Sequence, residues 1–395
     1  MPKIIETEGL TTNFYTYEGV VRALDRIALT VDTGSTFGLV GESGCGKSVT
    51  VRSMMRIIQA PGQIDSGKIV FFPTDEARNE GIDLLQQSEA FMERLRGEQI
   101  SMIFQEPNAA LNPIMSIGDQ VAESFFFHRS REMSQRILER LEKNGYPGGA
   151  LLKPLYRLGA ADPDHWGLRL LRRIPLLRRW EGLLKKEALK RAEEMIGQLG
   201  IPNPEEIVRR YPHNLSGGMK QRIVIGIALA CHPMLLIADE ATSNLDVTIQ
   251  AQILDLLLQL KKTTIASILL ITHDLGVVAE TCDRVGVMYA GQLCETADVE
   301  ELFTNPRHPY TKALLNAVPR LSQEGPLTSI EGNVPNLVKP PSGCRFHPRC
   351  AHAKEACRHS FPAMEEAAPG HQVACYLWTD RSRNGAENQK LSPDS

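Results

Sequence analysis

The sequence predicts an α/β fold with a buried sheet, and three observations support this class. Residues 37–40, 234–238 and 267–272 are predominantly apolar runs, the pattern of parallel strands that are buried on both faces. Each run ends at glycines or polar side chains, and helical periodicity dominates much of the chain between the first run and the second. In such folds the ends of the strands lie along one edge of the sheet, where ligands bind. We therefore expect the polar residues after these strands to share one site.

The composition is that of an ordinary globular protein of two or three domains. The chain has 395 residues, of which 42% are hydrophobic and 23% are charged. A net charge of −3 provides no overall basic field for nucleic acid. No apolar run approaches the roughly 20 residues that span a bilayer, and the N-terminus lacks the layout of a secretory signal. We therefore expect a protein of the cytosol with no nucleic-acid partner, whose membrane contact is peripheral or made through a partner.

The N-terminal residues predict an antiparallel β subdomain. Residues 1–35 alternate apolar and polar side chains, as short antiparallel strands with one solvated face do, and residues 67–72 form another strand. Tyr15 and Tyr17 precede the next motif by about two dozen residues, and either ring could stack on a purine. Packing of these rings on the surface of the sheet is at least as good an interpretation.

Residues 41–48 fit the phosphate-binding pattern G-x-x-x-x-G-K-[ST] and lie between a strand and a helix. A loop of this kind turns backbone N–H groups toward phosphate oxygens at the positive end of the helix. Lys47 would reach the β- and γ-phosphates, and Ser48 would bind Mg²⁺. Cys45 lies in the loop, where the helix N-terminus should lower the pKa of its thiol. The predicted nucleotide-binding residues here are Gly41, Glu42, Ser43, Gly44, Cys45, Gly46, Lys47 and Ser48.

Three later strands end in side chains suited to the hydrolysis of a nucleotide. Gln105 ends one strand beside a proline-containing loop that could move. Asp239 and Glu240 end the second, where the aspartate would orient Mg²⁺ through its water shell and the glutamate could polarise an attacking water. His273 follows the third. A lone histidine is more often structural, but the position at the shared edge of the sheet favours a functional one.

Residues 215–222, LSGGMKQR, open a strongly helical run. Ser216 can cap this helix, and Gly217 and Gly218 let backbone N–H groups approach a ligand. The chain thus has a second phosphate-binding helix terminus, which a simple single-site nucleotide hydrolase would not need.

Together these motifs make the chain resemble the ATP-binding-cassette ATPases over residues 4–320. In chain order the motifs are residues 41–48 (the P-loop), Gln105, residues 215–222 (the LSGG signature), Asp239 and Glu240, residues 243–246 (SNLD), and His273. The resemblance implies a P-loop NTPase core (RecA-like) with an antiparallel β subdomain and an enlarged helical subdomain. It also implies a head-to-tail dimer of two cassettes, in which ATP lies between the P-loop of one chain and the signature of the other.

The resemblance further implies a role for each motif residue. Glu240 is the general base, His273 contacts the γ-phosphate, and Gln105 senses Mg²⁺ and the attacking water. The residues that bind or support Mg²⁺ are Ser48, Gln105 and Asp239. The remaining nucleotide-site residues are Tyr15, preferred over Tyr17 for stacking on adenine, Ser216, Gly217 and Gly218 of the signature, and Asp246 at the dimer interface.

Two features depart from the cassette family. Ala241 follows Glu240 where such cassettes usually have proline, which should loosen the loop but leaves both carboxylates in place. The stretch between Gln105 and the signature is unusually long, and it contains residues 166–180, which are rich in arginine and leucine and flanked by tryptophans. This segment could lie on an anionic membrane surface or on a partner. It could also be a surface helix with solvated or paired arginines, and Pro175 interrupts its helical pattern.

The C-terminal quarter resembles that of the oligopeptide/dipeptide importers, and some nickel and glutathione importers share it. The resemblance covers residues 300–378 and is carried by residues 305–315, 332–335 and 340–350. Four cysteines in this region, spaced C-x5-C-x6-C-x17-C, could bind an iron–sulfur cluster or zinc: Cys344, Cys350, Cys357 and Cys375. Zinc sites favour tighter cysteine pairs, and some ATPases that resemble this chain carry a [4Fe–4S] cluster. This cluster is the leading prediction, and metal-free thiols or zinc are the alternatives.

The resemblance implies an ATP-hydrolysing subunit that powers the import of di- or oligopeptides through a membrane permease complex. Its partners would be two transmembrane permease subunits, a second cassette subunit and an extracytoplasmic substrate-binding protein, at the cytoplasmic face of the cell membrane. The alternatives are import of nickel or glutathione by the same machinery and a soluble cassette ATPase outside transport. The predicted domains are a cassette at 1–303 (core 1–112 and 223–303, helical subdomain 113–222), a small irregular C-terminal domain at 304–379 and a disordered tail at 380–395.

Overall fold

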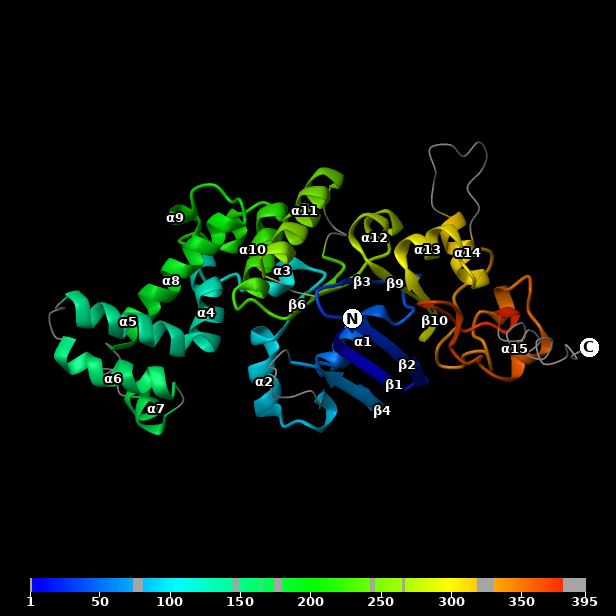
Figure 1. The fold of residues 1–395 in the computed structure, drawn as a ribbon, viewed down its shortest axis with the longest axis horizontal. Coiled ribbons are helices and arrows are strands. Elements are labelled where there is room, and N and C mark those ends of the chain that lie inside the picture. The colour runs from blue at the N-terminus through cyan, green and yellow to red at the C-terminus, as the bar shows by residue number, and fades with distance from the viewer. Residues whose placement is uncertain are drawn as a thin grey trace, which may run out of the picture. The chain divides into compact units, whose positions relative to one another are not determined.

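A computed structural model describes residues 2–73, 81–144, 149–163, 165–173, 180–241, 246–264, 267–317 and 330–378. The chain forms two compact units (Figure 1). The first comprises Met1–Glu89, Ile237–Glu240 and Lys261–Ser395, and the second comprises Ala90–Leu236 and Ala241–Leu260. The chain combines two sheets with helices, which confirms the predicted α/β class. The predicted domain boundaries stay predictions, and the predicted tail lies outside the described residues.

The N-terminal part of the first unit is an antiparallel sheet. Its strands are β1 (Lys3–Thr16), β2 (Gly19–Asp32), β4 (Gly62–Phe71) and β5 (Ile82–Asp83), in the order β2-β1-β4-β5, and the short 3₁₀ helix η1 (Leu84–Gln86) follows β5. Side chains along β1 and β2 alternate between buried and more exposed positions, and Leu10, Leu24 and Ile27 are buried. The antiparallel subdomain predicted from this alternation is confirmed.

A second, largely parallel sheet in the same unit carries the strand that leads into the P-loop. β3 (Thr36–Val40) pairs in parallel with β8 (Ser267–Ile271) on one side and with β9 (Arg284–Tyr289) on the other, and β7 (Leu235–Asp239) lies beyond β8. Every residue of β3, β7 and β8 is buried, as their largely apolar pattern predicts. The helices of this part are α1 (Lys47–Met54), α12 (Leu275–Thr281), α13 (Val299–Thr304) and α14 (Pro309–Asn316).

The C-terminal residues extend this sheet. β10 (Gln292–Asp298) is antiparallel to β9, and it also pairs with β12 (His371–Val373), which forms a hairpin with β11 (Glu365–Ala368). Between β10 and this hairpin, the described part of the C-terminal region from residue 330 onward is mostly irregular, with the 3₁₀ helix η4 (His347–Arg349) and the short helix α15 (Glu355–His359).

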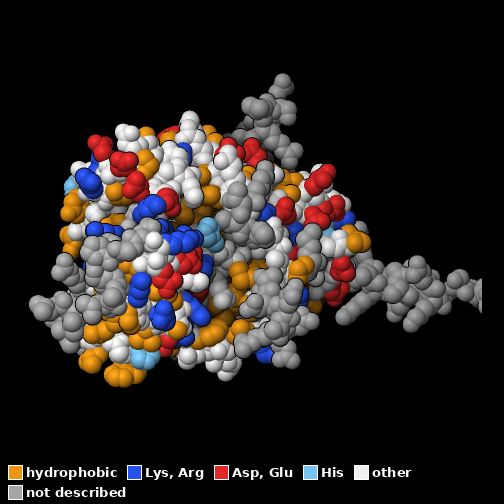
Figure 2. Space-filling model, turned by 60° about the vertical axis from the view of Figure 1, so that its left-hand side comes forward, with side chains coloured by type: hydrophobic (Ala, Val, Ile, Leu, Met, Phe, Trp, Pro, Cys, Tyr) orange, Lys and Arg blue, Asp and Glu red, His pale blue; other side chains and the backbone are white. Residues whose placement is uncertain are grey.

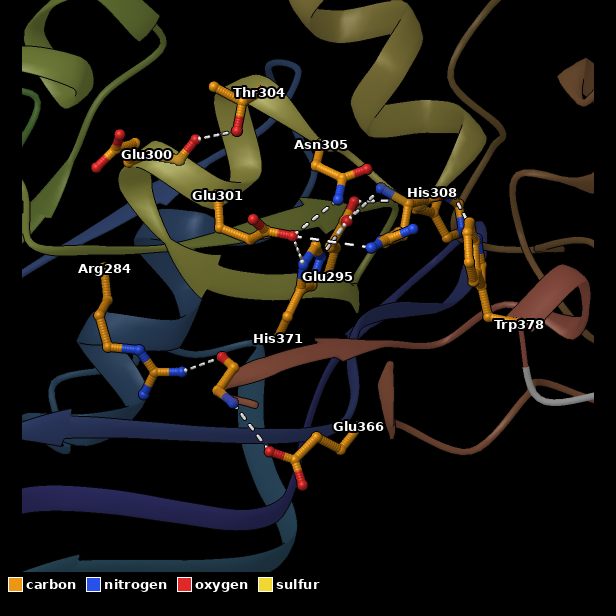
Figure 3. Close-up of polar contacts among 12 residues, drawn as sticks. Arg284, Glu295, Glu300, Glu301, Thr304, Asn305, His308, Glu366, His371 and Trp378 are labelled. Carbon is orange, nitrogen blue, oxygen red and sulfur yellow. Dashed lines mark hydrogen bonds and ion pairs between the residues drawn. The ribbon is translucent and has the colours of Figure 1, made fainter. Parts of the chain in front are cut away.

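A buried polar cluster holds the hairpin to β10 (Figure 3). The side chains of Glu295 and His371 are fully buried, and their Oε1 and Nε2 atoms lie 2.7 Å apart. The same carboxylate accepts hydrogen bonds from the backbone N–H groups of Arg307 at 2.6 Å and His308 at 3.0 Å. One carboxylate on β10 therefore joins the strand β12 to the turn that leads into α14.

The second unit is mainly helical. Its elements from α2 onward are α2 (Glu89–Glu98), β6 (Ile100–Ile103), α3 (Pro107–Ala110), α4 (Ile117–His128), α5 (Ser130–Asn144), α6 (Gly149–Ala161), α7 (Trp166–Arg173), α8 (Glu181–Gln198), α9 (Pro204–Ile207), η3 (Pro212–Asn214), α10 (Gly217–Leu229) and α11 (Val247–Thr264). β6 is joined to the beginning of β7, where the N–H group of Leu235 donates to the carbonyl of Gln99 at 3.1 Å. Helices α4, α5 and α8 pack together, and α6 packs on α5.

The two tryptophans that flank the arginine-rich segment lie in different environments. Trp166 is 73% exposed, whereas Trp180 is 2% exposed and packs edge-to-face on Tyr156. Trp180 therefore does not lie on a membrane surface, because its ring fills the core between α6 and α8. Residues 174–179 lie outside the described part.

On the face drawn in Figure 2, Lys and Arg side chains lie beside Asp and Glu side chains. None of the described helices is both long and apolar enough to cross a bilayer.

Candidate active site

The P-loop takes a conformation that only glycine allows at two of its positions. Gly41 has φ +149°, and a Cβ there would lie 2.1 Å from the carbonyl oxygen of Met288. Gly46 precedes α1 with φ +106°, and a Cβ there would lie 2.9 Å from the carbonyl oxygen of Ala23. No side chain caps the N-terminus of α1. The loop is therefore wedged against β9 and β2, and the positive end of α1 can serve an anion.

Lys47 and Ser48 each have defined polar partners, and their contacts with phosphate and Mg²⁺ stay predictions. Lys47 is 5% exposed, and its Nζ donates to the carbonyl of Gly41 at 2.7 Å and to that of Glu42 at 3.1 Å. The Oγ atom of Ser48 donates to Oδ1 of Asp239 at 2.8 Å. The structure thus brings together the P-loop and the end of β7, two segments that are far apart in the sequence.

Asp239 fits a divalent cation. Its side chain is buried at the edge of the sheet, and its Oδ2 atom is buried with no hydrogen-bond partner. Burial raises the pKa of the carboxyl group, against the hydrogen bond from Ser48, which lowers it. Carboxylate and hydroxyl oxygens are the ligands that Mg²⁺ prefers. A cation beside Ser48 and Asp239 would satisfy the unpaired oxygen and favour the ionised carboxylate.

Glu240 and His273 meet at the same edge. Glu240 has φ +48°, an uncommon left-handed conformation for a glutamate, and its N–H group donates to the carbonyl of Ile271 at 2.9 Å. Nδ1 of His273 lies 3.8 Å from Oε1 of Glu240. The histidine side chain is 62% exposed and that of the glutamate 19% exposed, so both can be reached from solvent. Strained backbone of this kind is concentrated at functional sites.

The second unit carries five predicted nucleotide-site residues: Gln105, Ser216, Gly217, Gly218 and Asp246. Ser216 caps α10 as predicted, because its Oγ accepts a hydrogen bond from the N–H group of Met219, and Ser216 and Gly217 are exposed. Gln105 is exposed in the loop after β6. Asp246 precedes α11, and its Oδ1 accepts a hydrogen bond from the N–H group of Ile249 at 3.0 Å. Gly218 faces the side chain of Ile249. Residues 243–245 lie outside the described part.

Tyr15 lies near the end of β1 with its ring 49% exposed. Its hydroxyl donates to Oδ2 of Asp65 at 2.9 Å, and this hydrogen bond raises the pKa of the phenol. Tyr17 is fully exposed in the turn between β1 and β2. Both rings are accessible, and the stacking of Tyr15 on adenine stays a prediction.

The expectation of a lowered thiol pKa at Cys45 is wrong. The side chain of Cys45 is fully buried, and burial raises the pKa of the thiol although the ammonium group of Lys47 lies 3.7 Å away. The sequence places this residue at a helix N-terminus, which favours a thiolate, but the loop folds over the sulfur and removes it from water. Desolvation outweighs both electrostatic effects.

The four C-terminal cysteines line one small cavity. Its volume is about 20 Å³, and its lining residues include Cys344, Cys350, Cys357 and Cys375. Burial raises the pKa of Cys344 to about 12 and that of Cys375 to about 11. Within the described ranges, no three or more His, Cys, Asp and Glu side chains are arranged to hold a metal ion. The four cysteines share one cavity but are not arranged as a metal site in this structure, and the [4Fe–4S] cluster, zinc and metal-free thiols stay predictions.

Two further residues contact the P-loop and were not predicted from the sequence. Tyr310 accepts a hydrogen bond from the N–H group of Glu42, and Arg349 forms an ion pair with the carboxylate of Glu42. Both lie in stretches that the sequence assigns to the importer-like C-terminal region, but no local pattern connects them to the nucleotide loop.

Comparison with known proteins identifies the family of the chain. Residues 24–243 match the model of the family described as ABC transporter, and residues 294–357 match that of the oligopeptide/dipeptide transporter C-terminal region. The chain is 39% identical to the dipeptide transport ATP-binding protein DppD of Bacillus subtilis (strain 168), over 100% of this chain and 99% of the relative. It is 40% identical to the oligopeptide transport ATP-binding protein OppD of the same organism, over 95% and 89% of the two chains.

A solved structure shares the fold. It is a dimeric ATP-binding cassette in a post-hydrolysis state bound to ADP and Pi, with 19% identity, a TM-score of 0.52, and coverage of 75% of this chain and 99% of the other. The family models and the relatives of 39–40% identity confirm the resemblance that the motifs predict. The chain therefore belongs to the ABC transporter family, as an ATP-binding subunit with ATPase activity that carries the C-terminal region of the oligopeptide/dipeptide transporters.

Proposed function

We propose that this ATPase powers the import of di- or oligopeptides through a membrane permease. One observation carries the proposal: the chain contains both the Ser48–Asp239 site and the C-terminal region of the peptide transporters. Tyr310 and Arg349 of this C-terminal region contact the P-loop. The names of the relatives, dipeptide and oligopeptide transport ATP-binding proteins, support the same cargo. The partners are two permease subunits, a second cassette and an extracytoplasmic substrate-binding protein. The chain associates peripherally with this complex at the cytoplasmic face of the membrane.

In this proposal each strand end has a separate task. Ser48 and Asp239 hold Mg²⁺, which when bound neutralises charge on the phosphates. Glu240 takes the proton of the attacking water, and His273 contacts the γ-phosphate beside it. Lys47 binds the β- and γ-phosphates, and Gln105 senses the metal and the water. Ser216, Gly217, Gly218 and Asp246 complete the ATP site of a second cassette, and Tyr15 stacks on adenine.

Reconstitution with the permease tests the cargo. The chain, its partner cassette and the two permease subunits are assembled in proteoliposomes, and ATP hydrolysis is measured with the binding protein loaded with peptide, glutathione or nickel. We expect peptide to stimulate hydrolysis, and Lys47→Ala to remove the stimulation as the matched control. Stimulation by nickel or glutathione but not by peptides would contradict the proposed cargo.

We further propose that Cys344, Cys350, Cys357 and Cys375 hold a [4Fe–4S] cluster. All four residues line one small cavity, which supports a shared ligand set, and their wide spacing favours a cluster over a single zinc ion. Protein purified without oxygen should be brown and contain about four iron and four sulfide per chain. Cys350→Ser should reduce both contents, whereas Cys231→Ser, a buried cysteine of the second unit, should not. Colourless protein with zinc or without metal would contradict this proposal.

A further inference from the structure

Glu42, the second residue of the P-loop, is held on three sides. Its backbone N–H group donates to the hydroxyl of Tyr310 at 2.9 Å. Its carbonyl oxygen accepts from Nζ of Lys47 at 3.1 Å. Its carboxylate pairs with the guanidinium of Arg349 through two bonds, Nη1 to Oε2 at 2.8 Å and Nη2 to Oε1 at 3.2 Å. Two of the three contacts come from residues beyond the stretch 24–243 that matches the ABC transporter model.

The guanidinium of Arg349 is buried and makes several hydrogen bonds. Its side chain is 5% exposed. Nε donates to the carbonyl of Glu331 at 2.8 Å, Nη2 donates to that of Ile330 at 3.1 Å, and Nη1 also donates to the hydroxyl of Tyr289 at 3.2 Å. Burial alone would lower the pKa of Arg349, but its hydrogen bonds to Glu42 and Tyr289 outweigh burial and raise it. A bidentate arginine–carboxylate pair fixes orientation as well as charge, so the guanidinium holds Glu42 in one position.

Tyr310 is fixed equally well. The residue is fully buried on α14, and its ring lies 4.6 Å from that of Tyr289 and 5.3 Å from that of Phe346, centroid to centroid. Phe346 belongs to the C-terminal segment that carries Arg349, and Figure 1 shows α14 beside this segment. The packed rings thus place the phenol oxygen at the Glu42 N–H group. Both contacts to the P-loop depend on the same aromatic cluster.

We propose that Arg349 and Tyr310 are positioning residues for ATP binding, through which the C-terminal region holds the P-loop in its phosphate-binding form. The carbonyl oxygens of Gly41 and Glu42 accept hydrogen bonds from the ammonium group of Lys47. A shift of Glu42 would therefore also move this cation. The positive charge of the guanidinium also balances the negative charge of the Glu42 carboxylate, which lies in a loop that binds phosphates. Without Arg349 the loop would sample other conformations, and the unpaired carboxylate would repel the nucleotide. Both effects reduce the fraction of chains that are competent to bind ATP.

Nucleotide binding by variants of the full chain tests this proposal. Arg349→Gln should raise the KM and Kd for ATP about tenfold, because the binding-competent fraction falls to about one tenth, while kcat changes by less than about threefold. Tyr310→Phe, which removes only the acceptor oxygen, should raise them by a smaller factor. Adding Glu42→Gln to Arg349→Gln removes the unpaired charge and should restore part of the affinity.

Two matched arginines separate positioning from general structure. Arg345 is also buried in the C-terminal segment, but it binds Asp25 and the carbonyls of Arg22 and Ala290 instead of the P-loop. Arg358 is exposed on α15. Neither Arg345→Gln nor Arg358→Gln should change the Kd for ATP in protein that melts as one folded species.

Two results would overturn the proposal. One is unchanged ATP affinity in both Arg349→Gln and Tyr310→Phe. The other is an equal loss of affinity in Arg345→Gln, because this would show that docking of the segment matters and the contact with Glu42 does not. If Arg349→Gln fails to fold, the nearly isosteric Tyr310→Phe decides alone.

Discussion

Replacing Glu240 with glutamine should lower kcat for ATP hydrolysis about 10²- to 10⁴-fold, the range expected for the loss of a general base. The carboxylate lies at the end of β7, accessible to solvent and 3.8 Å from Nδ1 of His273. Glutamine keeps the volume of the side chain but cannot accept a proton from water. It has the same backbone requirement as glutamate at φ +48°, so folding should be preserved. ATP should still bind, because Lys47, Ser48 and Asp239 are untouched.

Single-turnover hydrolysis and equilibrium binding of ATP separate chemistry from affinity in this variant. Glu280→Gln is the matched control, since Glu280 is an exposed carboxylate on α12 of the same unit. The control should hydrolyse ATP at the rate of the unchanged chain. Hydrolysis within about threefold of that rate in Glu240→Gln would show that another group activates the water.

The local part of the site could be predicted from the sequence because its signals are local. The spacing of residues 41–48 specifies a loop between a strand and a helix, and the runs that end at Asp239 and His273 specify buried strands. The topology of parallel strands then places these ends at one edge. The Ser48–Asp239 contact follows from these rules, although 191 positions separate the two residues.

The remaining features depend on packing that local patterns do not encode. Cys45 has the sequence context of a reactive thiol, but burial raises its pKa. Trp166 and Trp180 look alike in the sequence, yet one is exposed and the other lies in the core. The contacts of Glu42 with Tyr310 and Arg349 span 268 and 307 positions. They could be found only once the extension of the sheet by β10 and β12 had placed the C-terminal segment.

Glu295 lies on β10, where the C-terminal strand β12 extends the sheet, and its loss should reduce the stability of the chain the most. Glu295→Gln should lower the free energy of unfolding by about 3–5 kcal/mol, the cost of breaking a buried ion pair. Its carboxylate is fully buried against His371 and two backbone N–H groups. Burial would raise the pKa of Glu295, but hydrogen bonds, that from His371 above all, outweigh burial and lower it. Burial would likewise lower the pKa of His371, but Glu295 and Glu301 outweigh it and raise the pKa.

These two shifts give the stability difference a defined pH dependence. The raised pKa of His371 contributes stability that is complete below its ordinary value of 6.5 and is lost as the pH rises through the folded value. The lowered pKa of Glu295 contributes stability that is present above its ordinary value of 4.5 and is lost as the pH falls through the folded value. The difference between the unchanged chain and Glu295→Gln should therefore be largest between pH 4.5 and 6.5 and shrink on both sides.

Urea unfolding across this pH range measures the effect, with Glu300→Gln as the control. Glu300 is an exposed carboxylate on α13, close to the cluster in sequence, and its replacement should change the free energy of unfolding by less than about 0.5 kcal/mol at every pH. Because Glu295 also fixes the turn that leads into α14, where Tyr310 meets the P-loop, its loss should weaken ATP binding along with stability. Equal unfolding energies for the two variants, or a difference that does not vary with pH, would show that the Glu295–His371 pair carries no net charge interaction in the folded chain.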